Sequence, residues 1–277
     1  MLIDSHAHLN FNAFSSDYDE VIKECLENDI WMINIGSKYD NSKKAVEMAE
    51  RYDKGVYAAV GLHPVNLSTG LVKMRHDSVE GGNQSKEKEF DYDKYRELAK
   101  SSKVVAIGET GLDYYWRPKT TRKKELFKEK QKNLFLKQLS LAEELELPVV
   151  LHCRMAHQDL IPILSGKKPQ KAVAHSFVGG LEELRAYLGF GFYIGFNGII
   201  FKRIEGINFE EVIKETPLDR ILIETDCPYL SPPPFEDKRN TSLYVKYIAK
   251  EIAKIKNVGY DEISEITTQN AKELFEL

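Results

Sequence analysis

Short apolar runs alternate with longer amphipathic segments along the chain. The runs, which are candidates for strands, are MLID at 1–4, IWMINIG at 30–36, VYAAVGL at 56–62, VVAIGE at 104–109, PVVLH at 148–152, KAVAHSF at 171–177, FYIGF at 192–196 and ILIETD at 221–226. Between them, apolar residues recur at helical spacing in segments such as 17–29, 41–52 and 123–146. This alternation predicts βαβ units with a parallel sheet. Eight such units predict an α/β fold of the closed (β/α)8 TIM-barrel type rather than an open sheet.

Two stretches interrupt this rhythm. Residues 68–93 are polar, contain glycine and predict a long loop inserted after the third run. The sequence CPYLSPPPFEDKRN at 227–240 is rich in proline and predicts an ordered loop without a helix. Neither stretch resembles a linker between domains. We therefore expect a single domain over residues 1–277, with an insertion at about 68–93.

Composition narrows the class of protein. The chain has 277 residues, 42% of them apolar and 30% charged, and a net charge of −4, which is ordinary for a globular protein and neither indicates nor excludes nucleic acid. Cys25, Cys153 and Cys227 are widely spaced and form no CxxC pair, so we expect free structural thiols in a reducing compartment. Asp4 interrupts the first apolar stretch, so no signal peptide is expected and the predicted location is cytoplasmic.

Ionisable residues gather where the apolar runs end. His6 and His8 stand two positions apart, so on a strand both imidazoles face the same side. Later runs end in His63, Glu109, His152, His175 and Asp226. In a parallel barrel all these ends meet at one rim, where barrel enzymes build their active sites. The alternative interpretation is a set of unrelated polar residues, each satisfied by its own hydrogen bonds.

Four imidazoles and two carboxylates exceed what one catalytic ion with an open position needs. Two divalent ions that share a carboxylate account better for their number. Zinc, manganese and magnesium are the candidates, and ligation by several imidazoles favours zinc, manganese or cobalt. Cys153 and Cys227 each follow a candidate ligand, so alternation turns their side chains away from the site. His76 and His157 are expected to be ordinary surface residues.

The ordered motifs resemble one family. DSHAHL, GLHP, GETGLD, LHCR, HSFVGG, IETDCPYL and the closing TTQNAKELF together resemble the TatD family of metal-dependent deoxyribonucleases, within the amidohydrolase-like barrel superfamily. The resemblance covers nearly the whole chain and implies a barrel of the metallo-dependent hydrolase type. Three features depart from the family pattern: the long loop at 68–93, the sequence RNTS where the family usually has Arg-Asn-Glu-Pro, and Met155 where an acidic residue is frequent.

The resemblance also implies roles for individual residues. One ion would be held by His6, His8, Glu109 and Asp226, and the second by Glu109, His152 and His175. His63 and Arg154 would contact the substrate phosphate, and the guanidinium fork of an arginine suits phosphate oxygens. The alternative for Arg154 is a surface salt bridge.

The function implied by the resemblance is hydrolysis of DNA phosphodiester bonds, expected as a 3'-5' exonuclease on single-stranded DNA. The ions would lower the pKa of a bound water, and Asp226 would orient that water or take its proton. One alternative is an amide or ester hydrolase of the same superfamily, such as a D-aminoacyl-tRNA deacylase. A second alternative is a metal-stabilised protein that binds nucleic acid without turnover.

A basic tract follows the fourth run. The segment RPKTTRKKELFKEKQK at 117–132 holds eight basic residues against two acidic ones. It could follow the phosphates of a polyanion, while Tyr114, Tyr115 and Trp116 could stack on unpaired bases. The alternative is a solvated helix face beside a packed aromatic cluster.

Overall fold

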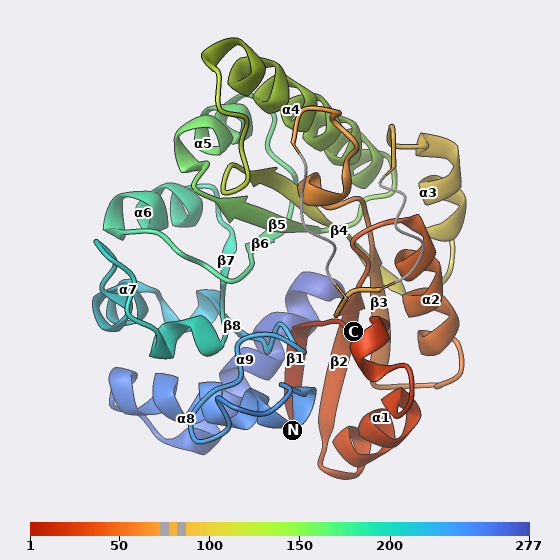
Figure 1. The fold of residues 1–277 in the computed structure, drawn as a ribbon. Coiled ribbons are helices and arrows are strands. Elements are labelled where there is room, and N and C mark those ends of the chain that lie inside the picture. Colours follow the sequence, from red (N-terminus) through yellow and green to blue (C-terminus); the bar gives the residue numbers. More distant parts are fainter. Residues whose placement is uncertain (73–77, 82–86) are drawn as a thin grey trace.

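The computed structural model describes residues 1–72, 78–81 and 87–277. In these ranges the strands are β1 (Leu2–Ala7), β2 (Ile30–Ile35), β3 (Val56–Val60), β4 (Val104–Asp113), β5 (Val149–Arg154), β6 (Ala172–Ala174), β7 (Tyr193–Phe196) and β8 (Ile221–Ile223). They pair in chain order, all parallel. A parallel contact of Ala7 with Cys227 joins the two edges of the sheet. The predicted (β/α)8 TIM-barrel fold is confirmed (Figure 1).

Helices follow the strands and surround the sheet (Figure 1). They are α1 (Tyr18–Glu27), α2 (Tyr39–Ala49), α3 (Tyr92–Leu98), α4 (Thr121–Glu144), α5 (His157–Gly166), α6 (Leu181–Gly189), α7 (Phe209–Glu215), α8 (Val245–Lys256) and α9 (Tyr260–Phe275). Short 3-10 turns are η1 (Asn12–Phe14), η2 (Pro64–Asn66), η3 (Gly198–Phe201), η4 (Leu218–Arg220) and η5 (Ser242–Tyr244). None of the helices in the described ranges combines the length and the apolar composition that a bilayer-spanning segment needs.

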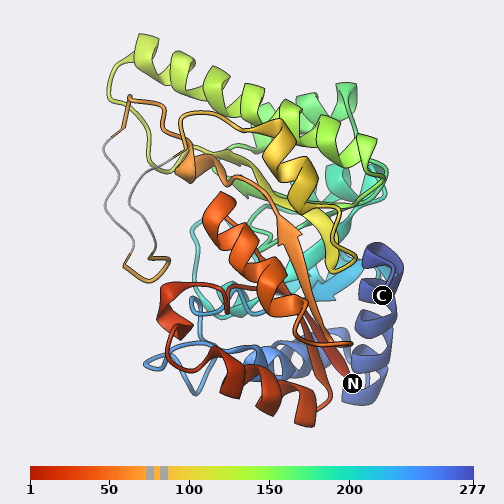
Figure 2. The same ribbon diagram turned by 90° about the vertical axis from the view of Figure 1, so that its right-hand side faces the viewer.

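Apolar side chains cover both faces of the sheet, the inner face within the barrel and the outer face beneath the helices. Those inside it include Ile3, Ile33, Ala59, Ala106, Val150, Val173 and Leu222. The helix α9 adds Ala271, Leu274 and Phe275 to this inner cluster, so it covers the end of the barrel where the strands begin (Figure 2). A second apolar layer lies between strands and helices. Parallel strands buried on both faces explain why the eight runs are nearly continuous in apolar residues. Because one end is covered, polar chemistry is confined to the opposite end.

The observed ends of one strand and the course of two loops can be compared with those expected from the sequence. The strand β4 continues beyond the expected 104–109 to Asp113, because Asp113 pairs with Arg154 of β5. The proline-rich segment 227–240 contains no helix, as expected. In the described part of 68–93, Glu87 forms an isolated bridge with Leu67, and α3 begins at Tyr92. His76 lies outside the described residues.

Candidate metal centre

A cavity of about 1110 Å³ opens at the end of the barrel where the strands finish. Its lining includes His8, His63, Glu109, His152, Arg154, His175 and Asp226. His6 lies behind this lining and is fully buried. The barrel therefore brings all the predicted site residues to one rim, although they come from segments as far apart as β1 and the loop after β8.

His6, His8 and Asp226 form one group. The two Nε2 atoms of the histidines lie 3.2 Å apart. Asp226 Oδ1 lies 3.4 Å from Nε2 of His8 and 3.8 Å from Nε2 of His6. Asp226 has a φ of 56°, a conformation uncommon for a residue with a side chain, and its N–H donates to the His6 carbonyl at 2.8 Å. The closure of the barrel between β8 and β1 thus positions the aspartate beside the two imidazoles.

Glu109 lies between this group and a second one. Its Oε2 is 3.6 Å from Nε2 of His6. Its Oε1 is 2.6 Å from Nδ1 of His152 and 2.9 Å from Nε2 of His175. The two oxygens of one carboxylate therefore face two different sets of imidazoles. This is the arrangement that a carboxylate bridging two cations requires.

In His8 and His152, the ring nitrogen that points away from the centre of the site makes a hydrogen bond. This hydrogen bond fixes which nitrogen faces the site. Nδ1 of His8 lies 2.9 Å from the Ile35 carbonyl, which can only accept, so Nδ1 carries the proton and the lone pair of Nε2 faces the site. Nε2 of His152 lies 3.1 Å from Oδ2 of Asp113, which would hold the proton on Nε2 and leave the lone pair of Nδ1, beside Glu109, for a bound cation. Such outer hydrogen bonds fix the tautomer and the ring orientation of metal-binding histidines.

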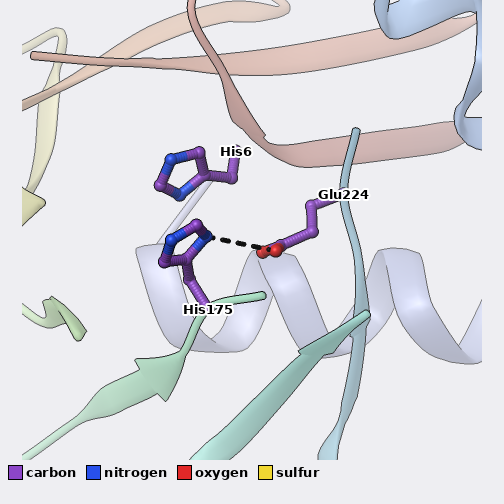
Figure 3. A group of neighbouring side chains, drawn as sticks. All are labelled: His6, His175 and Glu224. Carbon is purple, nitrogen blue, oxygen red and sulfur yellow. Dashed lines mark hydrogen bonds and ion pairs between the residues drawn. The ribbon is translucent and has the colours of Figure 1, made fainter. Parts of the chain in front are cut away.

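His175 is held in the same way by Glu224. Its Nδ1 lies 3.2 Å from Oε1 of Glu224 (Figure 3). The same oxygen also accepts the Ser176 N–H at 2.6 Å. The carboxylate fits because Gly195 has no side chain, since a Cβ there would lie 2.5 Å from Oε2 of Glu224. Nε2 of His175 is thereby directed to Glu109.

Sequence reasoning missed Asp113 and Glu224 as site residues. Both lie in motifs that were singled out, GETGLD and IETDCPYL. Asp113 follows Glu109 by four positions on β4, and Glu224 precedes Asp226 by two. Asp113 lies on the same strand as Glu109, and Glu224 directly follows the last residue of β8, so the position of a carboxylate at a strand end was the signal that could have identified both.

The buried charges stabilise one another. Burial alone would raise the pKa of Glu109, but His63, His175 and His152 hold it well below its usual range. Burial alone would lower the pKa of His152, but Glu109 and Asp113 raise it to about 9. The pKa of His175 is likewise raised, by Glu109 and Glu224, against the effect of burial. Without a metal these shifts favour an ionised Glu109 and protonated His152 and His175.

The residues fit a divalent metal. Ligand atoms of His6, His8 and Glu109, and those of Glu109, His152 and His175, lie within 4.8 Å of one another in each set. The described structure gives Nδ1 of His6 no hydrogen-bond partner, although the side chain is buried. Its ring stacks on His175 with 3.8 Å between centroids (Figure 3). A divalent cation bound among these groups would take the place of the protons on the inward nitrogens and offset the charge of Glu109.

Two further sets could also hold a cation by proximity: His6, His175 and Glu224, and His63, Asp113 and His152. Glu224 and Asp113 already accept from the outer nitrogens of His175 and His152. We therefore interpret these carboxylates as groups that orient ligands rather than as ligands.

His63 and Arg154 lie at the rim of the site. Nδ1 of His63 accepts the Val65 N–H at 3.1 Å, so its Nε2 carries the proton, 3.3 Å from Oε1 of Glu109. This nitrogen is a donor and suits an anionic ligand. Arg154 has no ion pair with a described residue, and its guanidinium carbon lies 3.8 Å from the centroid of the Tyr115 ring. The surface salt bridge considered for Arg154 is therefore not found in the described part of the chain.

The aromatic residues after β4 divide into two kinds. Tyr114 is only 5% exposed and packs in the core. Tyr115 and Trp116 are 48% and 43% exposed and line the cavity. The basic tract divides as well: Lys128 and Lys132 pair with Asp159. Its other exposed basic members are Arg117, Lys119, Arg122 and Lys123.

The interpretation of His157 as an ordinary surface residue was wrong. Its Nε2 lies 2.9 Å from the Val178 carbonyl, and its Nδ1 lies 2.9 Å from the hydroxyl of Tyr187. His157 is the first residue of α5, and its side chain packs against Tyr187 of α6 instead of pointing into solvent. Cys153 directs its sulfur to Nδ1 of His157 at 3.3 Å, and Cys227 is buried beside Ser242.

Comparison with known proteins identifies the family. The family model for TatD-related DNases matches residues 3–276. The metal-dependent hydrolase YabD of Bacillus subtilis is 39% identical, and the match covers 100% of both chains. The 3'-5' ssDNA/RNA exonuclease TatD of Yersinia pseudotuberculosis is 32% identical, again over 100% of both chains.

Solved structures agree with this result. The TatD homologue YjjV of Escherichia coli has a TM-score of 0.82 at 27% identity, covering 100% of this chain and 98% of that one. A TatD-family hydrolase of Entamoeba histolytica has a TM-score of 0.78 at 25% identity, covering 99% and 97%. The chain therefore belongs to the TatD-related DNase family of metal-dependent hydrolases.

Proposed function

We propose that this protein hydrolyses phosphodiester bonds of single-stranded DNA from the 3' end, with two divalent metal ions. The observation that carries the proposal is the position of Glu109, whose two oxygens face separate groups of imidazoles. The relatives named 3'-5' ssDNA/RNA exonuclease support the reaction and the substrate class.

The ligands of the first ion would be His6, His8, Glu109 and Asp226, and those of the second Glu109, His152 and His175. When bound, such ions activate water and offset negative charge on a phosphate. Asp113 and Glu224 would orient His152 and His175 from behind.

Side chains of the site would take the proton of the attacking water and bind the phosphate. Burial opposes ionisation of Asp226, but His8, His6 and His175 lower its pKa, so its carboxylate is available to take a proton from the attacking water. Nε2–H of His63 would donate to a phosphate oxygen. The guanidinium of Arg154 would donate two N–H groups to the same phosphate. Together these donors would hold the phosphorus close to the water.

The exposed rings of Tyr115 and Trp116 support a substrate with unpaired bases. Base stacking on an aromatic side chain tolerates every sequence, since each base has a π face. A duplex keeps its bases stacked on one another and would offer these rings nothing to bind. The aromatics therefore favour single strands.

Turnover of a labelled single-stranded oligonucleotide with manganese, magnesium or zinc tests this function. We expect nucleotides to be released by the parent and by Glu205→Ala, which alters an exposed carboxylate at the cavity, and none by Glu109→Ala. An aminoacyl ester assayed in parallel distinguishes the alternatives. Ester turnover without DNA cleavage would indicate a deacylase, and DNA binding with retained metal but without cleavage would indicate a binding protein.

A further inference from the structure

The segment 78–81 crosses the cavity mouth from the loop after β3 to the loop after β1. The N–H of Asn12 donates to the Glu80 carbonyl at 3.1 Å, and the N–H of Ala13 donates to the Val79 carbonyl at 3.0 Å. Figure 2 shows this segment beside the red turn η1. These two hydrogen bonds thus attach the loop after β3 to the loop after β1, which is not its neighbour in the sequence.

The carboxylate of Glu80 also attaches the segment to the connection between β2 and α2 and to the start of its own loop. Its Oε1 accepts from Nδ2 of Asn41 at 3.0 Å and from Nδ2 of Asn66 at 2.9 Å, and the hydroxyl of Ser37 donates to it as well. Nζ of Lys38 lies 3.9 Å from the same oxygen and 3.1 Å from the Gly81 carbonyl. The side chain of Glu80 is only 13% exposed. A charge with this many partners holds its segment in one position.

Gly81 allows the segment to approach η1 closely. Its φ is 66°, and a Cβ on this residue would lie 2.2 Å from Cβ of Asn12. A larger residue would therefore push the segment away from η1 without changing any charge.

The segment forms the wall of the cavity over the ends of β1, β2 and β3. Ser78, Glu80 and Gly81 line the cavity on this side. The opposite side, after β4 and β5, carries the exposed Tyr115 and Arg154. Figure 1 shows the two sides apart, with 78–81 near β1 and β2 and the segment before α4 near α5.

The two sides differ in what they offer a nucleic acid. The side after β4 presents a cationic guanidinium and aromatic rings, and Arg117 and Lys119 stand exposed beside it. The side formed by 78–81 presents backbone and the carboxylate of Glu80, which is mostly buried and paired with Lys38. A strand that continued past the site on this side would meet the wall formed by 78–81. The cation that the described residues place in this wall is Lys38, whose Nζ already contacts Glu80 and the Gly81 carbonyl.

We propose that segment 78–81 is an end stop, which restricts the site to the terminus of a single strand and excludes its interior. The strand lies over Tyr115 and Arg154, and its terminal nucleotide meets the wall at Glu80 and Gly81. This inference rests on the proposed nuclease function and makes 78–81 its specificity-determining segment.

The test compares linear and circular single-stranded DNA of the same sequence. The structure suggests a clean excision, because the N–H of Ser68 donates to the Glu87 carbonyl at 2.6 Å and the N–H of Glu87 donates to the Asn66 carbonyl at 3.0 Å. Residues 70–85 can thus be replaced by two glycines, because Ser68 and Glu87, on either side of the excision, are already hydrogen-bonded. Gly81→Val displaces the wall more mildly, and Glu89→Gln is the control, because Glu89 is exposed in the same connection.

We expect the parent and Glu89→Gln to cleave the linear strand and to cleave the circle slower by about a hundredfold or more, since the end stop rejects a strand without a terminus. The excised variant should cleave both at similar rates, and Gly81→Val should narrow the difference. Equal cleavage of both DNAs by the parent would overturn the proposal. So would an excised variant that keeps the circular-dichroism spectrum of the parent and still cleaves the circle as slowly, relative to the linear strand, as the parent does.

Binding provides a readout that does not depend on catalysis. With EDTA present, fluorescence anisotropy should show that the parent binds the fluorescent linear strand about tenfold more tightly than the circle, and that excision removes this preference. Equal affinities for the parent would contradict the end stop. If the metal-loaded parent cleaves neither DNA, the proposed nuclease function is wrong, while the binding comparison still decides about the end stop.

Discussion

The guanidinium carbon of Arg154 lies 3.8 Å from the centroid of the Tyr115 ring. The pairing of β4 with β5 brings the two residues together, since Asp113 and Arg154 are partners in the register and Tyr115 follows two residues later. The N–H of Tyr115 donates to Oδ1 of Asp113 at 2.9 Å, which fixes the start of the loop. The Tyr115 ring covers one face of the Arg154 guanidinium. The N–H groups of the guanidinium lie at the edge of its plane and remain available to a ligand in the cavity.

This stacking predicts a specific loss of substrate affinity. In Tyr115→Ala the guanidinium loses its support, and we expect the KM for a single-stranded oligonucleotide to rise about fivefold, equivalent to about 1 kcal/mol, with a smaller change in kcat. Tyr115→Phe keeps the ring and should behave like the parent. Steady-state kinetics of the two variants provide the check. An equal loss in both would indicate a role for the hydroxyl instead.

The hydrogen bond from His152 to Asp113 predicts weaker metal binding when the carboxylate is removed. In Asp113→Asn the partner of Nε2 is altered, so the ring is less firmly held with Nδ1 toward Glu109. We expect the affinity for Mn²⁺ or Zn²⁺ to fall by about 10–100-fold, as for other outer-sphere carboxylates. Titration calorimetry measures it. Asp159→Asn, which affects a carboxylate paired with Lys128 and Lys132, should retain the affinity of the parent.

The environment of His157 predicts a loss of stability in acid. Burial lowers the pKa of His157, so the folded protein holds it neutral while the unfolded chain titrates near its ordinary value of about 6.5. Below that pH the unfolded state binds more protons, so the free energy of unfolding decreases as the pH falls toward the lower folded value. At higher pH this effect is absent.

Urea unfolding of the metal-free protein at pH 7.5 and at lower pH values checks this expectation. The parent should lose more stability over this range than His157→Gln, which cannot be protonated. Both proteins contain the same imidazoles at the metal centre, so their difference isolates His157. An equal loss in the two proteins would show that His157 does not contribute to the acid sensitivity.

The barrel and the main site residues were predictable for physical reasons. Parallel strands covered on both faces consist of apolar runs, and helices between them show helical spacing, so both could be read in order. The ends of parallel strands meet at one rim, which made His6, His8 and Asp226 neighbours in the prediction. The same reasoning located Glu109 among them.

The parts that were missed depend on contacts between distant segments. Asp113 extends β4 only because β5 continues beside it, and the position of Glu224 behind His175 depends on the space at Gly195. His157 looked like a polar helix residue, and its burial against Tyr187 comes from the packing of α5 on α6. The contact of Glu80 with the loop after β1 has no signal in a polar stretch of sequence.

The bridging position of Glu109 is the central claim, and anomalous diffraction from crystals grown with Mn²⁺ tests it most directly. We predict two peaks, one on each side of the Glu109 carboxylate, the first beside His6, His8 and Asp226 and the second beside His152 and His175. A single peak with only one carboxylate oxygen directed to it, or manganese bound away from Glu109, would contradict the account.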